Sequence, residues 1–174
     1  MHCAARHMSD DSHNPERRRS LDERDTDPFA AHHMRITSPL GIDEERTIHQ
    51  VIGSAIAVHR ALGPGFLESI YRQAMRIELD ARGLRSERER SIRVMYRGVQ
   101  LSGQRLDLIV NGLVVVELKA VSGIEEIHRA QLISYLRATG LRAGLLINFR
   151  VRVLKEGLHR IVLSQAGPSG SALR

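Results

Sequence analysis

Two neighbouring apolar segments, each interrupted by charge, limit the folds open to this chain more than any other feature. Residues 106–110 are apolar except for Asp107, and residues 113–120 are apolar except for Glu117 and Lys119. Both segments are short enough to be buried strands. Charged side chains are almost never fully buried unless they are paired or hold a metal. We therefore expect two strands at the core whose charged positions serve a specific purpose.

The connection between these strands decides whether the charges meet. A two-residue turn at Asn111-Gly112, which this dipeptide favours, would place Asp107 and Glu117 on opposite faces of the hairpin. A three-residue loop over 110–112 with a bulge would pair Asp107 with Val115 and bring both acids to one face. We predict this odd register.

Together, the two acids and the lysine would suit metal-assisted phosphodiester hydrolysis. Two carboxylates form a hard-oxygen site for Mg²⁺ or Mn²⁺. Lysine supplies a compact point charge, and this choice is unusual because only Lys119 and Lys155 among 26 basic residues are lysine. The alternative is a purely structural salt bridge of Lys119 with Glu117 or Asp107.

Hydrophobic periodicity predicts an α/β fold in which one mixed sheet is flanked by helices. The first helix is expected to start at an N-cap, Asp43, and to end before Gly63-Pro64. Gly83 and Gly140 are expected to follow the other two helices. The predicted helices cover about 43–62, 66–82 and 124–139, and the predicted strands cover about 92–96, 104–110, 113–119, 143–148 and 160–163.

The domain organisation follows from composition. Residues 1–40 are poor in large apolar side chains and predict a disordered N-terminal extension, within which Met34 is an alternative start. Residues 41–165 form the predicted domain, and 166–174 a flexible C-terminal tail. No apolar run approaches the ~20 residues of a membrane span. The single cysteine, Cys3, fits a reducing compartment, so we expect a cytoplasmic protein.

Charge points to a polyanionic partner. Residues 1–40 hold six Arg against seven Asp/Glu, whereas residues 41–174 hold twenty Lys/Arg against thirteen Asp/Glu, a net charge of about +7. A basic folded part favours nucleic acid. Aromatic residues make up only 3% of the chain, which argues against extensive stacking of bases on aromatic side chains.

Two predicted helices add polar candidates. Gln131, Tyr135 and His128 fall on one face of a helix, where they would hold a nucleotide phosphate or base, or else simply form its polar side. Glu68 is either a third acid that reaches the metal through water or half of a surface pair with Arg72, four residues on.

Five motifs in order resemble one family. Residues 65–71 match the motif that names the GxxExxY protein family, and four further segments are similar to it: 58–64, 116–120, 130–136 and 145–149. The resemblance covers about residues 42–163. This family is grouped with the PD-(D/E)XK nuclease-like superfamily, so the resemblance implies a restriction-endonuclease-like core of order α-β-β-β-α-β.

The resemblance also implies roles for the candidate residues. Asp107 and Glu117 match the metal-binding acids, Lys119 the catalytic lysine and Glu68 the acid on a helix. Gln131 and Tyr135 match a QxxxY motif of exonuclease-like relatives. One position departs from the pattern, because Leu106 stands where the signature has proline.

The function expected on these grounds is a Mg²⁺- or Mn²⁺-dependent nuclease acting on DNA, with RNA as the less favoured substrate. The alternative is a nucleic-acid- or protein-binding module that keeps the nuclease-like fold without catalysis. Whether the chain forms a homodimer stays open at this point.

Overall fold

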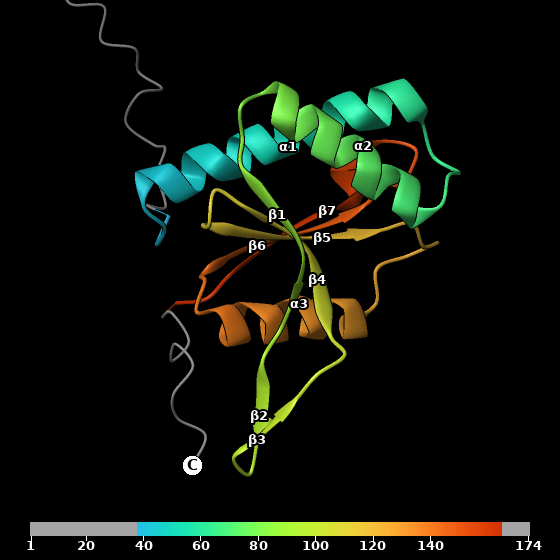
Figure 1. Cartoon of the computed structure of the whole chain (residues 1–174). Helices are drawn as coiled ribbons and strands as arrows, with labels where there is room; N and C mark the ends of the chain where they lie inside the picture. The colour runs from blue at the N-terminus through green and yellow to red at the C-terminus, as the bar shows by residue number, and fades with distance from the viewer. Residues whose placement is uncertain (1–37, 165–174) are drawn as a thin grey trace, which may run out of the picture. The chain divides into compact units, whose positions relative to one another are not determined.

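The computed structural model describes residues 38–164, apart from the side chains of Arg88 and Glu89 (Figure 1). The tail predicted for 166–174 and most of the predicted N-terminal extension lie outside the described residues. Within the described range, Leu40 is buried in the core, although the sequence assigned it to the extension. None of the described helices is long and apolar enough to cross a membrane.

A five-stranded mixed sheet forms the centre of the fold. Its strand order is β1-β4-β5-β6-β7, in which β5 and β6 are parallel and the other neighbours are antiparallel. The strands are β1 (Ser86–Ser91), β4 (Arg105–Val110), β5 (Val114–Lys119), β6 (Ala143–Asn148) and β7 (Leu158–Val162). A short 3₁₀ helix, η1 (Leu154–Gly157), precedes β7.

Helices cover both faces of this sheet (Figure 1). On one face, α1 (Ile42–Leu62) and α2 (Glu68–Ala81) bury an apolar cluster against the strands. On the other face, α3 (Glu126–Thr139) packs on a second, smaller cluster. The central strands β5 and β6 are almost entirely buried because both of their faces are covered. The predicted α/β architecture is thus confirmed.

The predicted helices are present, with small changes at their ends. Gly41, not Asp43, is the N-cap of α1, and the Glu44 carboxylate accepts a hydrogen bond from the Gly41 amide at 2.7 Å. Asp43 lies instead in the first turn, where its charge suits the helix dipole. Gly83 and Gly140 both have positive φ just after α2 and α3, as expected of glycines that follow a helix.

The prediction of the first core strand was wrong. The strand that pairs with β4 is β1, whose residues are all Ser, Glu or Arg and show no apolar alternation. It lies at the edge of the sheet, where polar side chains are favoured. The predicted strand at 92–96 is largely β2 (Val94–Tyr96), which pairs only with β3 (Val99–Leu101) in a separate two-stranded sheet.

The hairpin between β4 and β5 has the predicted odd register, but a different loop. The last pairs are Leu108 with Val116 and Val110 with Val114, so the loop is Asn111–Leu113 and not 110–112. Asn111 and Gly112 both have positive φ, and the Leu113 amide donates to the Val110 carbonyl at 3.0 Å. Asn111 and Gly112 thus form a tight turn, and Leu113 is the third residue that a two-residue loop would not contain. If this register is continued by one residue, Asp107 lies opposite Glu117, whereas the prediction placed it opposite Val115.

Candidate functional site

Asp107 lies just beyond the end of the pairing between strands β4 and β5, whose last pair on this side is Leu108 with Val116. The Asp107 carboxylate oxygen Oδ2 accepts a hydrogen bond from the Leu118 amide at 2.9 Å. A buried side chain thus replaces the strand's own hydrogen bonding at this point, and Asp107 is held against β5.

Glu117 and Lys119 form a buried ion pair at the end of β5. Lys119 Nζ lies 2.7 Å from Glu117 Oε1, and the two side chains are only 12% and 4% exposed. The other carboxylate oxygen, Glu117 Oε2, is buried and has no hydrogen-bond partner among the described residues. Such an oxygen is costly to bury unless something else contacts it.

The electrostatics of this pair reflect the crowding of acids. Burial and, to a lesser extent, the charge of Asp107 raise the pKa of Glu117 to about 7, against the opposing hydrogen bond from Lys119. Burial alone would lower the pKa of Lys119, but Glu117, Glu68 and Asp107 together raise it. Lys119 therefore stays an ammonium, whereas Glu117 is only about half ionised near pH 7, and additional positive charge nearby would favour its anionic form.

Arg72 joins the acid of helix α2 to the acid of strand β4. Its Nη2 lies 2.8 Å from Glu68 Oε1, and its Nε lies 2.8 Å from Asp107 Oδ1. The second contact is an ion pair without an aligned hydrogen bond, since Arg72 Nε has no hydrogen-bond partner within residues 38–164. The helical pair expected from the sequence is present, but it also reaches the site. Three carboxylates and two cations therefore meet here.

The loop before α2 fixes the position of Glu68. The Tyr71 hydroxyl donates to the Gly63 carbonyl at 2.7 Å and accepts from the Phe66 amide at 3.2 Å. The Tyr71 ring stacks on Phe149 with centroids 4.4 Å apart. Tyr71 thus connects this loop to the core. The loop leads directly into Glu68, the first residue of α2.

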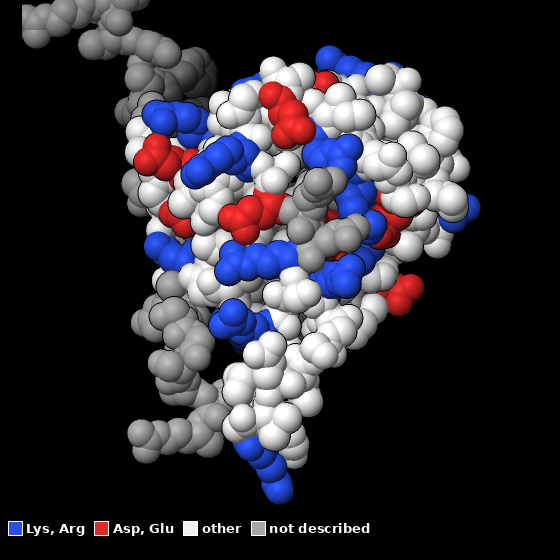
Figure 2. Space-filling view, viewed as in Figure 1, with Lys and Arg blue, Asp and Glu red and all other residues white. Residues whose placement is uncertain are grey.

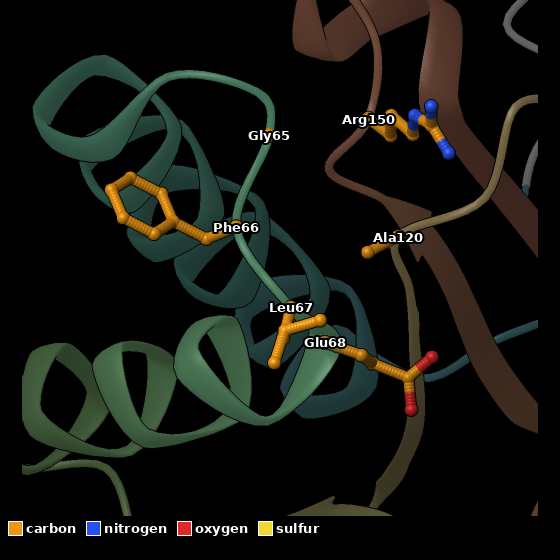
Figure 3. Close-up of a pocket in the computed structure, with 6 residues that line it drawn as sticks. All are labelled: Gly65, Phe66, Leu67, Glu68, Ala120 and Arg150. Atoms are coloured by element: carbon orange, nitrogen blue, oxygen red, sulfur yellow. The ribbon is translucent and has the colours of Figure 1, made fainter.

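A pocket of about 440 Å³ opens beside Glu68 (Figure 3). The segment that leads into α2 forms one side, from which the Glu68 side chain projects. Ala120, just after β5, and Arg150, just after β6, line the other. The pocket is therefore lined by one acid, Glu68, and by one exposed arginine, Arg150.

Asn148 holds the two segments on that side together and was missed by sequence reasoning. Its Oδ1 accepts from the amides of Val121 and Arg150, and its Nδ2 donates to the Val121 carbonyl at 2.8 Å. It is buried and pairs in register with Lys119 across the parallel strands. The available signal was an amide side chain at the end of the apolar run 143–147.

Helix α3 contributes Tyr135 and Gln131. The Gln131 amide donates to the Tyr135 hydroxyl, which in turn donates to the Arg105 carbonyl at 3.3 Å. Burial raises the pKa of Tyr135, with further contributions from the charges of Glu117 and Asp107, so its hydroxyl lies within electrostatic reach of the acids. His128 is used differently, because its Nδ1 accepts from the Glu125 amide at the start of the helix at 3.0 Å.

The residues present fit a hard divalent cation. Asp107 and Glu117 offer carboxylate oxygens, the ligands that Mg²⁺ and Mn²⁺ prefer, and Glu117 Oε2 is an unpartnered buried oxygen. Among residues 38–164, no three His, Cys, Asp or Glu side chains are already gathered as a metal site. Arg72 and Lys119 instead contact the carboxylates, so a cation would have to rearrange these pairs.

Comparison with known proteins supports the same reading of the fold. A sequence model of the family described as the PD-(D/E)XK nuclease superfamily matches residues 45–161. Searches of curated proteins and of solved structures give no match. The narrower resemblance to the GxxExxY family stays a prediction. The matched range spans every candidate site residue and more than half of the chain, and the chain therefore belongs to the PD-(D/E)XK nuclease superfamily.

Proposed function

We propose that this chain is a divalent-metal-dependent nuclease that hydrolyses phosphodiester bonds in DNA. The observation that carries the proposal is the junction of β4, β5 and α2, where Lys119 pairs with Glu117 and Arg72 links Asp107 to Glu68. Three acids gathered at one place are difficult to explain by stability alone, because buried ion pairs add little net stability.

In this proposal Asp107 and Glu117 hold Mg²⁺ or Mn²⁺, and Glu68 reaches it through water. The bound cation would polarise the scissile phosphate and lower the pKa of a bound water. The protein's own contribution is to orient the carboxylates, through the Leu118 amide for Asp107 and, before a cation binds, the Lys119 ammonium for Glu117.

Lys119 has a separate role toward the substrate. Its ammonium is already within the site and donates a hydrogen bond to Glu117 from a largely buried position, where such interactions are stronger than in water. We assign it to stabilise negative charge on the phosphate as the water attacks. Gln131 and Tyr135 on α3 would place the nucleic-acid strand, with His128 one turn earlier on the same helix.

DNA is the preferred substrate class in this proposal. The excess positive charge of residues 41–174 suits a phosphate backbone, and basic side chains are spread over the face seen in Figure 2. Charge does not distinguish DNA from RNA, so RNA belongs in the same experiment.

The test is cleavage of single-stranded, duplex and branched DNA and of RNA by the purified chain with Mn²⁺, and with EDTA as the blank. We expect metal-dependent cleavage that falls by about 100-fold or more in Lys119→Ala, as for loss of a donor to a developing anion. Lys155→Ala is the matched control, because Lys155 is the other lysine of the chain and is exposed on η1. Asp107→Asn should also abolish cleavage, whereas Asp80→Asn at the end of α2 should not. The absence of cleavage on every substrate would overturn the proposal.

One observation favours the alternative, a binding module without catalysis. Asp107, Glu68 and Glu117 each already have a cationic partner in Arg72 or Lys119, so the charges are compensated without a metal. A binding module predicts salt-sensitive DNA affinity that Lys119→Ala leaves unchanged, with no cleavage in Mn²⁺. The nuclease instead predicts cleavage in Mn²⁺ that disappears in Lys119→Ala.

A further inference from the structure

The β2–β3 hairpin, residues 94–101, is a surface that the proposed chemistry does not use. It forms its own two-stranded sheet. In the sequence it lies between β1 and β4, which are neighbours in the main sheet. In Figure 1 it projects beyond α3, away from the sheet. All six of its strand residues are exposed, so its fold buries neither of its faces.

One face of this hairpin is entirely apolar. Val94 pairs with Leu101 and Tyr96 pairs with Val99, and residues directly opposite in an antiparallel ladder share a face. Tyr96 and Val99 are 61% and 63% exposed. Contiguous exposed apolar surface of this kind marks an interaction site.

Charge identifies the kind of partner. From residue 91 to residue 106 the chain has no Asp or Glu, but it includes Arg93, Arg97 and Arg105. Figure 2 shows no acidic side chain on the hairpin. At the turn, the Arg97 guanidinium lies 5.7 Å from the centre of the Tyr96 ring. An acid-free, arginine-bearing apolar surface complements a nucleic acid, which offers phosphates and base edges together.

The shape fits the same partner. A two-stranded β-ribbon is narrow enough to enter the major groove of B-DNA, and apolar side chains can also wedge between base steps from the minor groove. Six positions separate Leu101 from Asp107, at most about 20 Å of extended chain. That length corresponds to about six base pairs of duplex, at 3.4 Å per step. The Tyr135 hydroxyl, bound to the Arg105 carbonyl, connects the base of the hairpin to α3.

We infer that the β2–β3 hairpin is a DNA-binding arm that enters a groove of the duplex flanking the cleaved phosphate, with Tyr96 and Val99 on the bases and Arg97 at a phosphate or base edge. The inference rests on the proposed function for its substrate. Duplex binding in EDTA, where no cleavage occurs, tests it separately.

The experiment compares variants of the full chain by fluorescence anisotropy with a labelled duplex at several salt concentrations. We expect the double variant Tyr96→Ser, Val99→Ser to bind duplex about tenfold more weakly or worse, since apolar base contacts are lost. Its control is Ile77→Ser on α2, an equally exposed apolar residue outside the hairpin. Arg97→Ala should reduce the slope of log K against log salt by about one, whereas Arg137→Ala on α3 should not.

Two results would overturn the inference. One is duplex affinity unchanged in the double variant, and the other is no duplex binding by the unaltered chain. If the affinity is unchanged and the double variant also shifts from dimer to monomer in sedimentation, the hairpin is a contact between copies. If the hairpin variants lose binding but no substrate is ever cleaved, the proposed nuclease activity fails and the binding arm stands.

Discussion

The Arg72 guanidinium lies 2.8 Å from Asp107 Oδ1, across the boundary between helix α2 and strand β4. The same guanidinium contacts Glu68 at 2.8 Å. One cation therefore links two of the carboxylates proposed to form the metal site. A divalent ion and Arg72 would compete for the same oxygens.

Arg72→Ala is expected to tighten Mn²⁺ binding severalfold, because an ion pair of about 1 kcal/mol would no longer oppose it. The measurement is titration calorimetry with Mn²⁺ on the intact chain. Arg82→Ala is a suitable control, since Arg82 makes the same kind of contact with Glu78 on the same helix but away from the site. Equal or weaker Mn²⁺ binding in Arg72→Ala would show that Arg72 does not compete with the cation.

The raised pKa of Glu117 predicts that the metal-free protein loses stability as the pH rises. Its pKa is about 7 in the folded chain against an ordinary value of 4.5, chiefly because of burial. Between these values the folded state binds a proton that the unfolded state does not. The stabilisation is therefore complete below about pH 4.5 and is lost as the pH rises through about 7. Its upper limit is about 3 kcal/mol.

Urea unfolding in EDTA from pH 5 to 8 measures this effect, with Glu117→Gln as the reference. His159 acts in the opposite direction, because burial and the nearby Arg129 lower its pKa and its contribution is lost as the pH falls. Because both the unaltered chain and Glu117→Gln contain His159, the difference between their free energies of unfolding removes that contribution. Parallel pH profiles for the unaltered chain and Glu117→Gln would contradict the assignment.

The sequence was a good guide wherever burial leaves a periodic pattern. The helices and the strands β4, β5 and β6 repeat apolar residues at the spacing of their secondary structure, so they were predicted within a few residues. Strand β1 was not, because an edge strand needs no buried side chains and this one contains only Ser, Glu and Arg. Its place in the sheet depends on pairing with β4, which no local pattern reveals.

The same distinction applies to the site. Asp107, Glu117 and Lys119 could be nominated because charge inside an apolar strand requires an explanation. Arg72 could not, because its spacing from Glu68 already accounts for it as a local helical pair. Its contact with Asp107 depends on how α2 packs against the sheet. The exact loop between β4 and β5 also escaped prediction, since Asn111 and Gly112 are compatible with loops of two or three residues.

Tyr71→Phe is expected to lower the free energy of unfolding by about 1–2 kcal/mol. The substitution removes the hydroxyl that contacts both the Gly63 carbonyl and the Phe66 amide while keeping the ring on Phe149. Urea denaturation provides the measurement. Tyr96→Phe is the matched control, because that tyrosine is exposed on the hairpin and should change stability little. Equal effects of the two substitutions would mean that the Tyr71 hydroxyl does not hold the loop before α2.

Gly157→Ala should destabilise the end of strand β6 and, with it, the side of the site that Asn148 organises. A Cβ at position 157 would lie 2.3 Å from the backbone carbonyl oxygen of Asn148, which a flexible side chain cannot relieve. Forcing such an overlap typically costs about 1–3 kcal/mol. Gly123→Ala is the control, since a Cβ there meets no atom within 4 Å, and surface changes of this kind stay within about 0.5 kcal/mol. Thermal and urea unfolding of both variants should separate them clearly. A Gly157→Ala protein as stable as Gly123→Ala would show that η1 can move away from β6 without cost, and that the packing of Gly157 does not support Asn148.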